Sequence, residues 1–188
     1  MELEELVYQS KLAQMAGRYE DMFEIMSSAA MMGVELTEES KVLFSIAYQN
    51  VASGKRASLR RLESVEKTEK SKGNLTSVRM VKAYRQKVKD ELIRLCHNML
   101  ELIDIHLLPH SLVPRSWILL NKMKGDGYRL LASLSEEHEM KSFCDKSLSA
   151  YELASETAKA SLHNCDALKL ALDLNTGLIL SVQKVINK

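Results

Sequence analysis

The chain has 188 residues, which is enough for one well-buried core or at most two small ones. Its 26 basic and 25 acidic side chains leave a net charge of +1, so overall charge gives no reason to expect a nucleic-acid partner. No apolar run reaches the roughly 18 residues that a membrane span needs, and the acidic, amphipathic N-terminus is unlike a signal peptide, so neither a membrane partner nor secretion is expected.

The composition favours long helices. Hydrophobic residues make up 46% of the chain, with only 7 Gly and 2 Pro, and no stretch shows the alternating, β-branched pattern of a strand. We therefore predict an all-α fold, an antiparallel array of about seven helices. In chain order, the predicted helices cover about Glu2–Ala16, Tyr19–Met32, Glu38–Lys70, Val78–Leu108, Arg115–Leu134, Glu136–Leu162 and Ala167–Ile186.

Local signals set several of these boundaries. Gly33 is expected to end the second helix, and the hydroxyl of Thr37 suits an N-cap for the third. Thr76 or Ser77 is the predicted cap of the fourth helix, which Pro109 stops. Two glycines, Gly125 and Gly127, are expected to weaken the middle of the fifth.

The stretch VLFSIAYQNVASGKRASLRRLESVE, residues 42–66, combines an apolar first half with a basic second half. Its apolar residues recur at helical spacing, so one stripe can pack against neighbouring helices. On another stripe Gln49, Arg56 and Arg60 are seven and four residues apart and share one side of the helix. Guanidinium groups presented in this way suit recognition of an oxyanion, although a solvated basic face gives the same pattern.

Motifs of enzymes and metal sites are missing. None of GxGxxG, GxxxxGK[ST], HExxH or GxSxG occurs, and Pro109 lies between His106 and His110. We predict no catalysis, no cofactor and no metal site. The three cysteines, Cys96, Cys144 and Cys165, show no paired spacing, which is typical of a reducing compartment and favours a cytoplasmic location.

Several segments together resemble the 14-3-3 family. They are LVYQSKLAQMAGRYEDM, LTEESKVLFSIAYQNVASGKRASLRR, AYRQKVKDEL, NKMKGDGYRLL and LALDLN, which follow the family's order and spacing. The resemblance implies an all-helical dimeric adaptor that binds phosphoserine and phosphothreonine segments of client proteins. The net charge of +1 departs from that family, whose members are usually strongly acidic.

The resemblance also implies a phosphate pocket. Its two arginines fall on Arg56 and Arg129, which can each offer paired donors to phosphate oxygens. The family's lysine falls on Gln49 and its tyrosine on Leu130, so half of the pocket is altered. Around the phosphate, the implied groove residues are Lys122, Asn175, Leu174 and Leu178, with Arg60 beside the pocket.

The dimer surface is implied in the same way. The matching positions are Leu12, Ala16, Arg18, Asp21, Ser58, Leu62, Val65, Tyr84, Lys87 and Glu91. The family pattern pairs Arg18 with Glu91 and Asp21 with Lys87 across the interface, and both pairs keep opposite charges here. A homodimer is therefore expected, or a heterodimer with another family member.

These implications describe one domain over residues 1–188, with dimerisation in residues 1–70 and the groove in residues 40–188. The family has two more helices beyond the position of Lys188, and they supply one wall of the groove. Either the protein lacks them or the sequence omits a C-terminal part. The alternative function is a regulatory or structural subunit that dimerises with family members and binds phosphopeptides weakly or not at all. A helical-repeat scaffold of another kind is a further alternative.

Overall fold

The computed structural model describes residues 2–186 and consists of seven α-helices and one short π-helix. In chain order they are α1 (Leu3–Met15), α2 (Tyr19–Ala30), α3 (Glu38–Ser71), α4 (Leu75–Leu102), η1 (Ile103–Leu107), α5 (Pro114–Leu134), α6 (Glu137–Ser161) and α7 (Ala167–Ile186). No strand occurs among these residues, so the predicted all-α class is confirmed.

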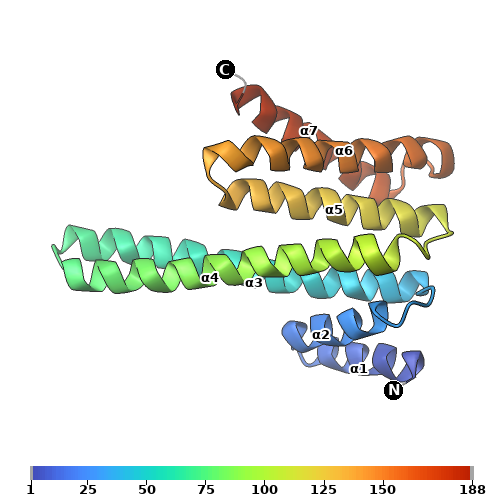
Figure 1. The fold of residues 1–188 in the computed structure, drawn as a ribbon, viewed down its shortest axis with the longest axis horizontal. Coiled ribbons are helices and arrows are strands. Elements are labelled where there is room, and N and C mark those ends of the chain that lie inside the picture. Colours follow the sequence, from blue (N-terminus) through green and yellow to red (C-terminus); the bar gives the residue numbers. More distant parts are fainter. Residues whose placement is uncertain (1, 187–188) are drawn as a thin grey trace.

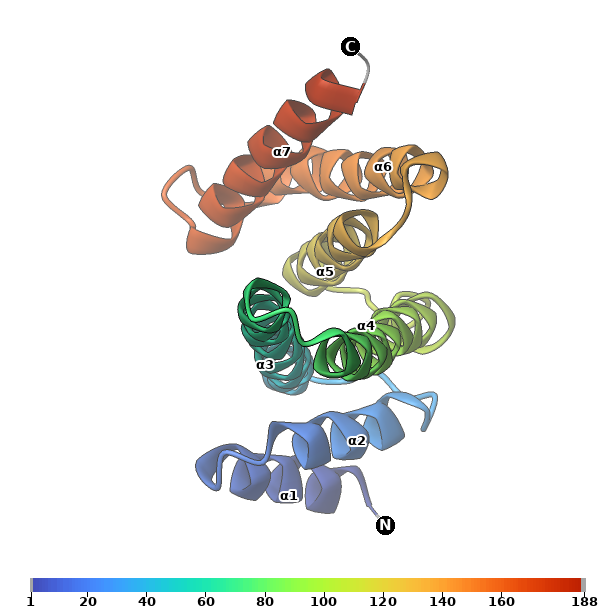
Figure 2. The ribbon, with the colours of Figure 1, turned by 90° about the vertical axis from the view of Figure 1, so that its left-hand side faces the viewer.

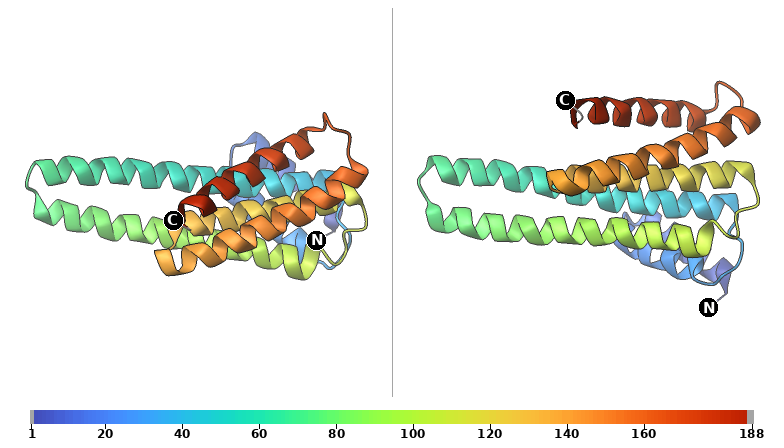
Figure 3. Two further views of the ribbon diagram at one scale, coloured as in Figure 1. Left: turned by 90° about the horizontal axis from the view of Figure 1, so that it is seen from above. Right: turned by 45° about the horizontal axis from the view of Figure 1, so that its top comes forward.

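The helices stack in chain order (Figure 1). The pair α1 and α2 lies at one end, the long pair α3 and α4 in the middle, and α5, α6 and α7 on the other side, so the two ends of the chain lie far apart. Figure 2 shows this stack end-on, with successive helices packed side by side. In Figure 3, α3 and α4 extend well past the other helices, and α7 lies obliquely over α6.

Local capping explains several helix ends. The Thr37 hydroxyl accepts a hydrogen bond from the Ser40 backbone N–H (3.1 Å), which confirms the predicted cap of α3. The cap of α4 differs from the prediction, because Asn74 accepts from the Ser77 N–H and the helix begins at Leu75. Gly33, predicted to end the second helix, has φ 68°, a conformation that side chains with a Cβ rarely adopt, but α2 itself ends at Ala30.

The C-terminal part of the predicted fourth helix is also different. The α-helical hydrogen bonding ends at Leu102, and residues 103–107 form the π-helix before the chain reaches Pro109. Gly125 and Gly127 do not interrupt α5, which is continuous over both. Both glycines are buried, so their lack of a side chain serves close packing between helices.

Two apolar clusters hold the stack together. The larger joins α1 to α5 and includes the stacked rings of Phe23 and Phe44, whose centroids lie 5.6 Å apart. The smaller joins α5, α6 and α7 around the buried ring of Tyr151. Helix α5 contributes to both clusters and therefore connects the two halves of the molecule.

Candidate functional site

A cavity of about 600 Å³ opens between α3, α5, α6 and α7. Six of the residues implied as phosphopeptide-binding line it: Gln49, Arg56, Arg129, Leu130, Asn175 and Leu178. They come from three helices that are far apart in the sequence, and α3 contributes two of them at a spacing of seven residues, on one face of the helix. The cavity therefore combines cationic, amide and apolar groups on one surface.

The carboxylate of Asp126 is the centre of a polar network in this cavity. Its Oδ2 accepts a hydrogen bond from Lys122 Nζ (2.7 Å), and its Oδ1 accepts from Asn175 Nδ2 (2.9 Å) and from the Tyr151 hydroxyl (2.6 Å). A guanidinium nitrogen of Arg129 lies 3.6 Å from Oδ1. The network joins α5, α6 and α7 and fixes the side chains that face the cavity.

Arg129 is held from two sides. Its Nε donates a hydrogen bond to the Tyr151 hydroxyl oxygen (3.3 Å), in addition to the ion pair with Asp126. Burial by itself lowers the pKa of Arg129, but the hydrogen bond from Arg129 to Tyr151 and the charge of Asp126 outweigh this effect and raise it. The guanidinium is thus a permanent, oriented cation with remaining N–H donors available to an anion.

Tyr151 is the residue that sequence reasoning missed. The side chain is fully buried, and its hydroxyl connects Arg129 to Asp126. Burial, and then the charge of Asp126, raise the pKa of Tyr151, so the hydroxyl stays protonated and can donate to Asp126. An aromatic residue on an amphipathic helix usually belongs to the core, and only the contact of Tyr151 with α5 reveals this polar role.

The two altered pocket positions also face the cavity. Gln49 is exposed and donates a hydrogen bond from Nε2 to the Ser45 hydroxyl (3.2 Å), and Leu130 is half-buried. The apolar part of the wall includes Met140, Leu178 and the buried Cys144. Burial raises the pKa of the Cys144 thiol, which argues against a reactive thiolate at this position.

Three implied binding residues do not line this cavity. Lys122 forms an ion pair with Asp126. Leu174 lies on α7 with 66% of its surface exposed, and Arg60 lies one helical turn beyond Arg56 on α3. Arg60 instead lines a second cavity, of about 470 Å³, between α3, α4 and α5. The two cavities meet at Arg56, Leu130 and Ser133, which line both.

The implied dimer residues lie on α1 to α4, except Ala16 and Arg18, which lie in the turn between α1 and α2. Leu12, Val65 and Tyr84 are exposed although they are large and apolar or aromatic. Arg18 forms an ion pair with Asp21 of its own chain, and Glu91 accepts a hydrogen bond from Lys55 Nζ (3.0 Å). Arg18, Asp21 and Glu91, which the family pattern pairs between protomers, therefore have partners within this chain, whereas Lys87 forms no ion pair with any residue from 2 to 186.

A metal centre and a membrane-spanning helix are both absent from residues 2–186. No group of three or more His, Cys, Asp or Glu side chains there could hold a metal ion. In the same part of the chain, no helix is both long enough and apolar enough to cross a membrane.

Comparison with known proteins agrees with this architecture. A family model described as "14-3-3 protein" matches residues 9–182. The chain is 42% identical over 174 residues to the 14-3-3-like protein GF14 iota of Arabidopsis thaliana, an alignment covering 93% of this chain and 65% of the relative. It is 44% identical over 174 residues to 14-3-3 protein 7 of Solanum lycopersicum, covering 93% of this chain and 69% of that protein.

A fungal relative is similar to the same extent. Identity to the 14-3-3 family protein artA of Aspergillus flavus is 43% over 172 residues, covering 92% of this chain and 72% of the relative. The chain thus spans about two thirds of the length of the curated relatives it matches. Because the family model covers most of the chain and the identities exceed 40%, the chain belongs to the 14-3-3 family.

Proposed function

We propose that this chain is an adaptor that binds phosphoserine or phosphothreonine segments of client proteins in the cavity between α3, α5, α6 and α7. One observation carries the proposal: Arg56 of α3 and Arg129 of α5 line the same cavity. Two guanidinium groups from different helices can clamp the oxygens of one phosphate, which is the strongest phosphate contact that side chains make. The 14-3-3 family consists of non-enzymatic adaptors, so no catalytic step is part of the proposal.

The neighbouring groups suit a peptide as well as its phosphate. Asn175 reaches the cavity from α7, and its amide can bond to a peptide backbone in exchange for Asp126. Leu178 and Val182 offer an apolar surface for a side chain next to the phosphorylated residue. A phosphorylated segment can thus lie along α7 with its phosphate at Arg56 and Arg129.

The proposed pocket differs from the family pattern at Gln49 and Leu130, which take the places of a lysine and a tyrosine. A charge-assisted hydrogen bond contributes about 1.5–3 kcal/mol, so the loss of two such contacts lowers affinity by roughly two orders of magnitude or more. We therefore propose that the chain binds phosphopeptides more weakly than a protein with the complete pattern.

Fluorescence anisotropy with a phosphoserine peptide and its dephosphorylated twin tests this function. Arg129→Ala should abolish the preference for the phosphorylated peptide because it removes the paired guanidinium contact. Gln49→Lys should increase that preference by adding a positive charge to the cavity that Arg56 and Arg129 line. Arg94→Ala is the matched control, since Arg94 is exposed on α4 and lines neither cavity, and it should leave the preference unchanged.

The experiment also separates the proposal from its alternative. Equal binding of the two peptides by the unmodified chain and by Gln49→Lys would exclude the phosphopeptide function and favour a regulatory subunit that acts through pairing with family members. We propose that this pairing uses the exposed surface around Leu12, Val65 and Tyr84. It would form a homodimer or a heterodimer with another family member, and we propose a cytoplasmic location.

A further inference from the structure

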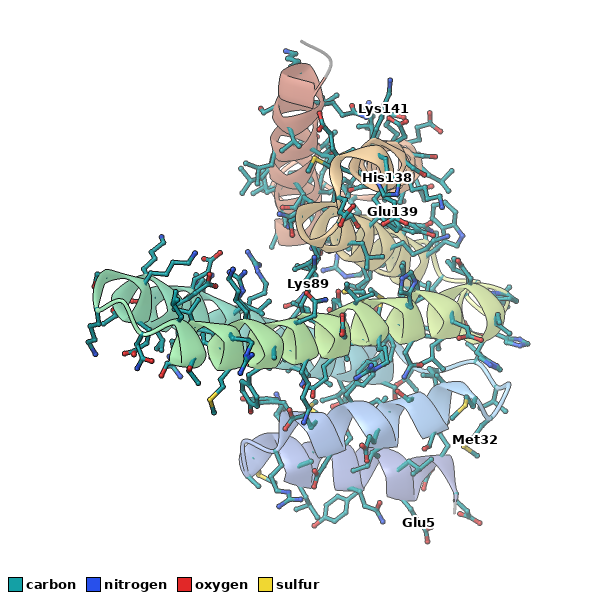
Figure 4. All side chains as sticks on the ribbon, turned by 60° about the vertical axis from the view of Figure 1, so that its left-hand side comes forward. Glu5, Met32, Lys89, His138, Glu139 and Lys141 are labelled. Carbon is teal, nitrogen blue, oxygen red and sulfur yellow. The ribbon has the colours of Figure 1, made fainter. Side chains whose placement is uncertain are left out.

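The second cavity, between α3, α4 and α5, is a concave surface with an excess of positive charge. Four cationic side chains line it, Arg56 and Arg60 from α3 and Arg85 and Lys89 from α4, and Glu63 is the single carboxylate that lines it among residues 2–186. Each helix contributes its two cations at a spacing of four residues, which places them on one face. In Figure 4, Lys89 is labelled on the side of α4 that faces α5 and the start of α6.

Only one of the four cations is neutralised within the described part of the chain. Arg85 lies 3.6 Å from Glu63 and 3.3 Å from Glu66. Arg56, Arg60 and Lys89 form no ion pair with any residue from 2 to 186. Like charges gathered on facing helices repel one another, and a bound anion would remove that repulsion.

The shape of the cavity distinguishes it from an ordinary solvated basic face. Its apolar wall is formed by Leu59, Leu130 and Leu134, so the cations surround a concave surface that includes apolar area. A charge in a concavity with low-dielectric walls acts more strongly on a ligand than the same charge on a convex surface. The combination fits a small dianion carried by a peptide, because the phosphate satisfies the cations and the neighbouring residues cover the apolar wall.

We propose that this second cavity is a subsite for a second phosphate on the same client segment, so that the chain prefers doubly phosphorylated segments. The inference rests on the proposed function, because the first phosphate occupies the first cavity. Continuity supports it, since Arg56, Leu130 and Ser133 line both cavities and no helix separates them.

The spacing between the two phosphates follows from α3. Arg60 and Glu63 lie four and seven residues beyond Arg56, which corresponds to about 6 to 10 Å of rise along the helix. An extended peptide covers about 3.3 Å per residue, so the second phosphate belongs two or three residues from the first.

The test compares peptides by isothermal titration calorimetry with the full chain. One peptide carries a single phosphoserine, and four others carry a second phosphoserine two or three residues before or after it. At least one doubly phosphorylated peptide should bind about tenfold more tightly than the single one, because it gains a charge-assisted contact. A peptide with glutamate at the second position should gain much less, and an equal gain would overturn the assignment to a phosphate.

Lys89→Gln identifies the cavity that is responsible. The variant should reduce the ratio of the affinities for the doubly and the singly phosphorylated peptide to near one. Arg94→Gln should preserve this ratio, because it removes a charge from the exposed face of α4 outside both cavities. A preference for two phosphates that survives in Lys89→Gln would overturn this location. If all five peptides bind with equal affinity but the singly phosphorylated peptide still binds better than its dephosphorylated twin, the subsite alone is overturned. If the singly phosphorylated peptide and its dephosphorylated twin also bind equally, the proposed function fails as well.

Discussion

At the scale of single residues, Gly125 sets how closely α5 approaches α6 beneath the first cavity, the one lined by Arg56 and Arg129. A Cβ atom added there would lie 2.5 Å from Cδ1 of Tyr151, inside the normal contact distance. The Tyr151 ring is buried, and its hydroxyl is fixed by Arg129 and Asp126, so the ring cannot move aside freely. The glycine therefore permits the contact that positions Arg129.

This contact yields a prediction about stability and binding. Gly125→Ala should lower the free energy of unfolding by about 1–3 kcal/mol through overpacking, despite the better helix propensity of alanine. It should also weaken phosphopeptide binding by displacing Tyr151. Gly177→Ala is the control, because nothing lies within 4 Å of its added Cβ, and it should raise stability by up to about 1 kcal/mol. Urea unfolding measures the stability of both variants. A Gly125→Ala variant as stable as Gly177→Ala would contradict the close approach of α5 to Tyr151 of α6.

The difference between Arg129 and Tyr151 shows what could be predicted from the sequence at this scale. Arg56 and Arg129 were predicted because their sequence segments resemble a family pattern, and both line the cavity. The role of Tyr151 depends on a contact between two helices whose approach is set by Gly125, and no local pattern encodes that distance. The glycines were instead expected to weaken α5, because propensity describes an isolated helix and not one packed on both sides.

At the scale of whole elements, Arg115 connects the starts of three helices. From the first turn of α5, its Nε lies 2.8 Å from Glu38 at the start of α3, and its NH1 lies 2.5 Å from Asp166, just before α7. Asp166 also accepts a hydrogen bond from the Leu168 N–H (2.8 Å) and so helps to begin α7. The Arg115 guanidinium, and next the bond from Leu168, hold the pKa of Asp166 below its usual value.

A pH-dependent contribution to stability follows from that shift. Because the pKa of Asp166 is lower in the folded chain than in the unfolded chain, its stabilising effect is fully present above the unfolded value of about 4. The effect is lost as the pH falls through the lower, folded pKa. We predict that Asp166→Asn is less stable than the unmodified chain at pH 7 and that the difference becomes smaller below pH 4. Thermal unfolding at pH 7 and at a pH below 4 measures the difference in stability, and Asp173→Asn, at an exposed position, is the control. A stability difference between Asp166→Asn and the unmodified chain that does not depend on pH would contradict the prediction.

Helix boundaries were predictable where their chemistry is local. The cap at Thr37 involves a hydroxyl and a backbone N–H three residues apart, so the sequence alone indicated it. Between Gly73 and Ser77 several residues could cap α4, and the choice of Asn74 depends on the turn that follows α3. No local pattern in the sequence distinguishes the π-helix at residues 103–107 from a continued α-helix, and its buried Ile103 and Leu107 belong to the larger apolar cluster.

At the scale of the whole molecule, the stack separates two kinds of surface. The two cavities lie among α3 to α7, whereas the residues implied in dimerisation lie on α1, α2, the turn between them, and the long pair α3 and α4. Helix α3 serves both, since Arg56 and Arg60 line the cavities and Ser58 belongs to the implied interface. A change at Ser58 can therefore act on assembly without removing a residue that lines a cavity.

Ser58 provides the test of that separation. It follows Lys55 and Arg56 and precedes Leu59, a spacing that resembles the substrates of basophilic kinases. In this chain it is half-buried, and its hydroxyl donates a hydrogen bond to the Gly54 carbonyl (3.1 Å), which is compatible with a helix surface facing a partner. A phosphate there carries about −1.5 to −2 charges, and its desolvation in a closed contact between two protomers costs more free energy than pairing with the neighbouring arginines restores.

We predict that Ser58→Glu shifts the chain from dimer to monomer and leaves its helical content unchanged, measured by sedimentation at low micromolar concentration and by circular dichroism. Ser58→Ala keeps a small residue at this position and should stay dimeric, which separates the effect of charge from that of side-chain size. Ser149→Glu adds the same charge to the exposed face of α6, away from the implied interface, and should also stay dimeric. A dimer that persists in Ser58→Glu would rule out the switch. Dissociation of Ser58→Ala to the same extent would instead show that the serine hydroxyl, and not the absence of charge, maintains the contact.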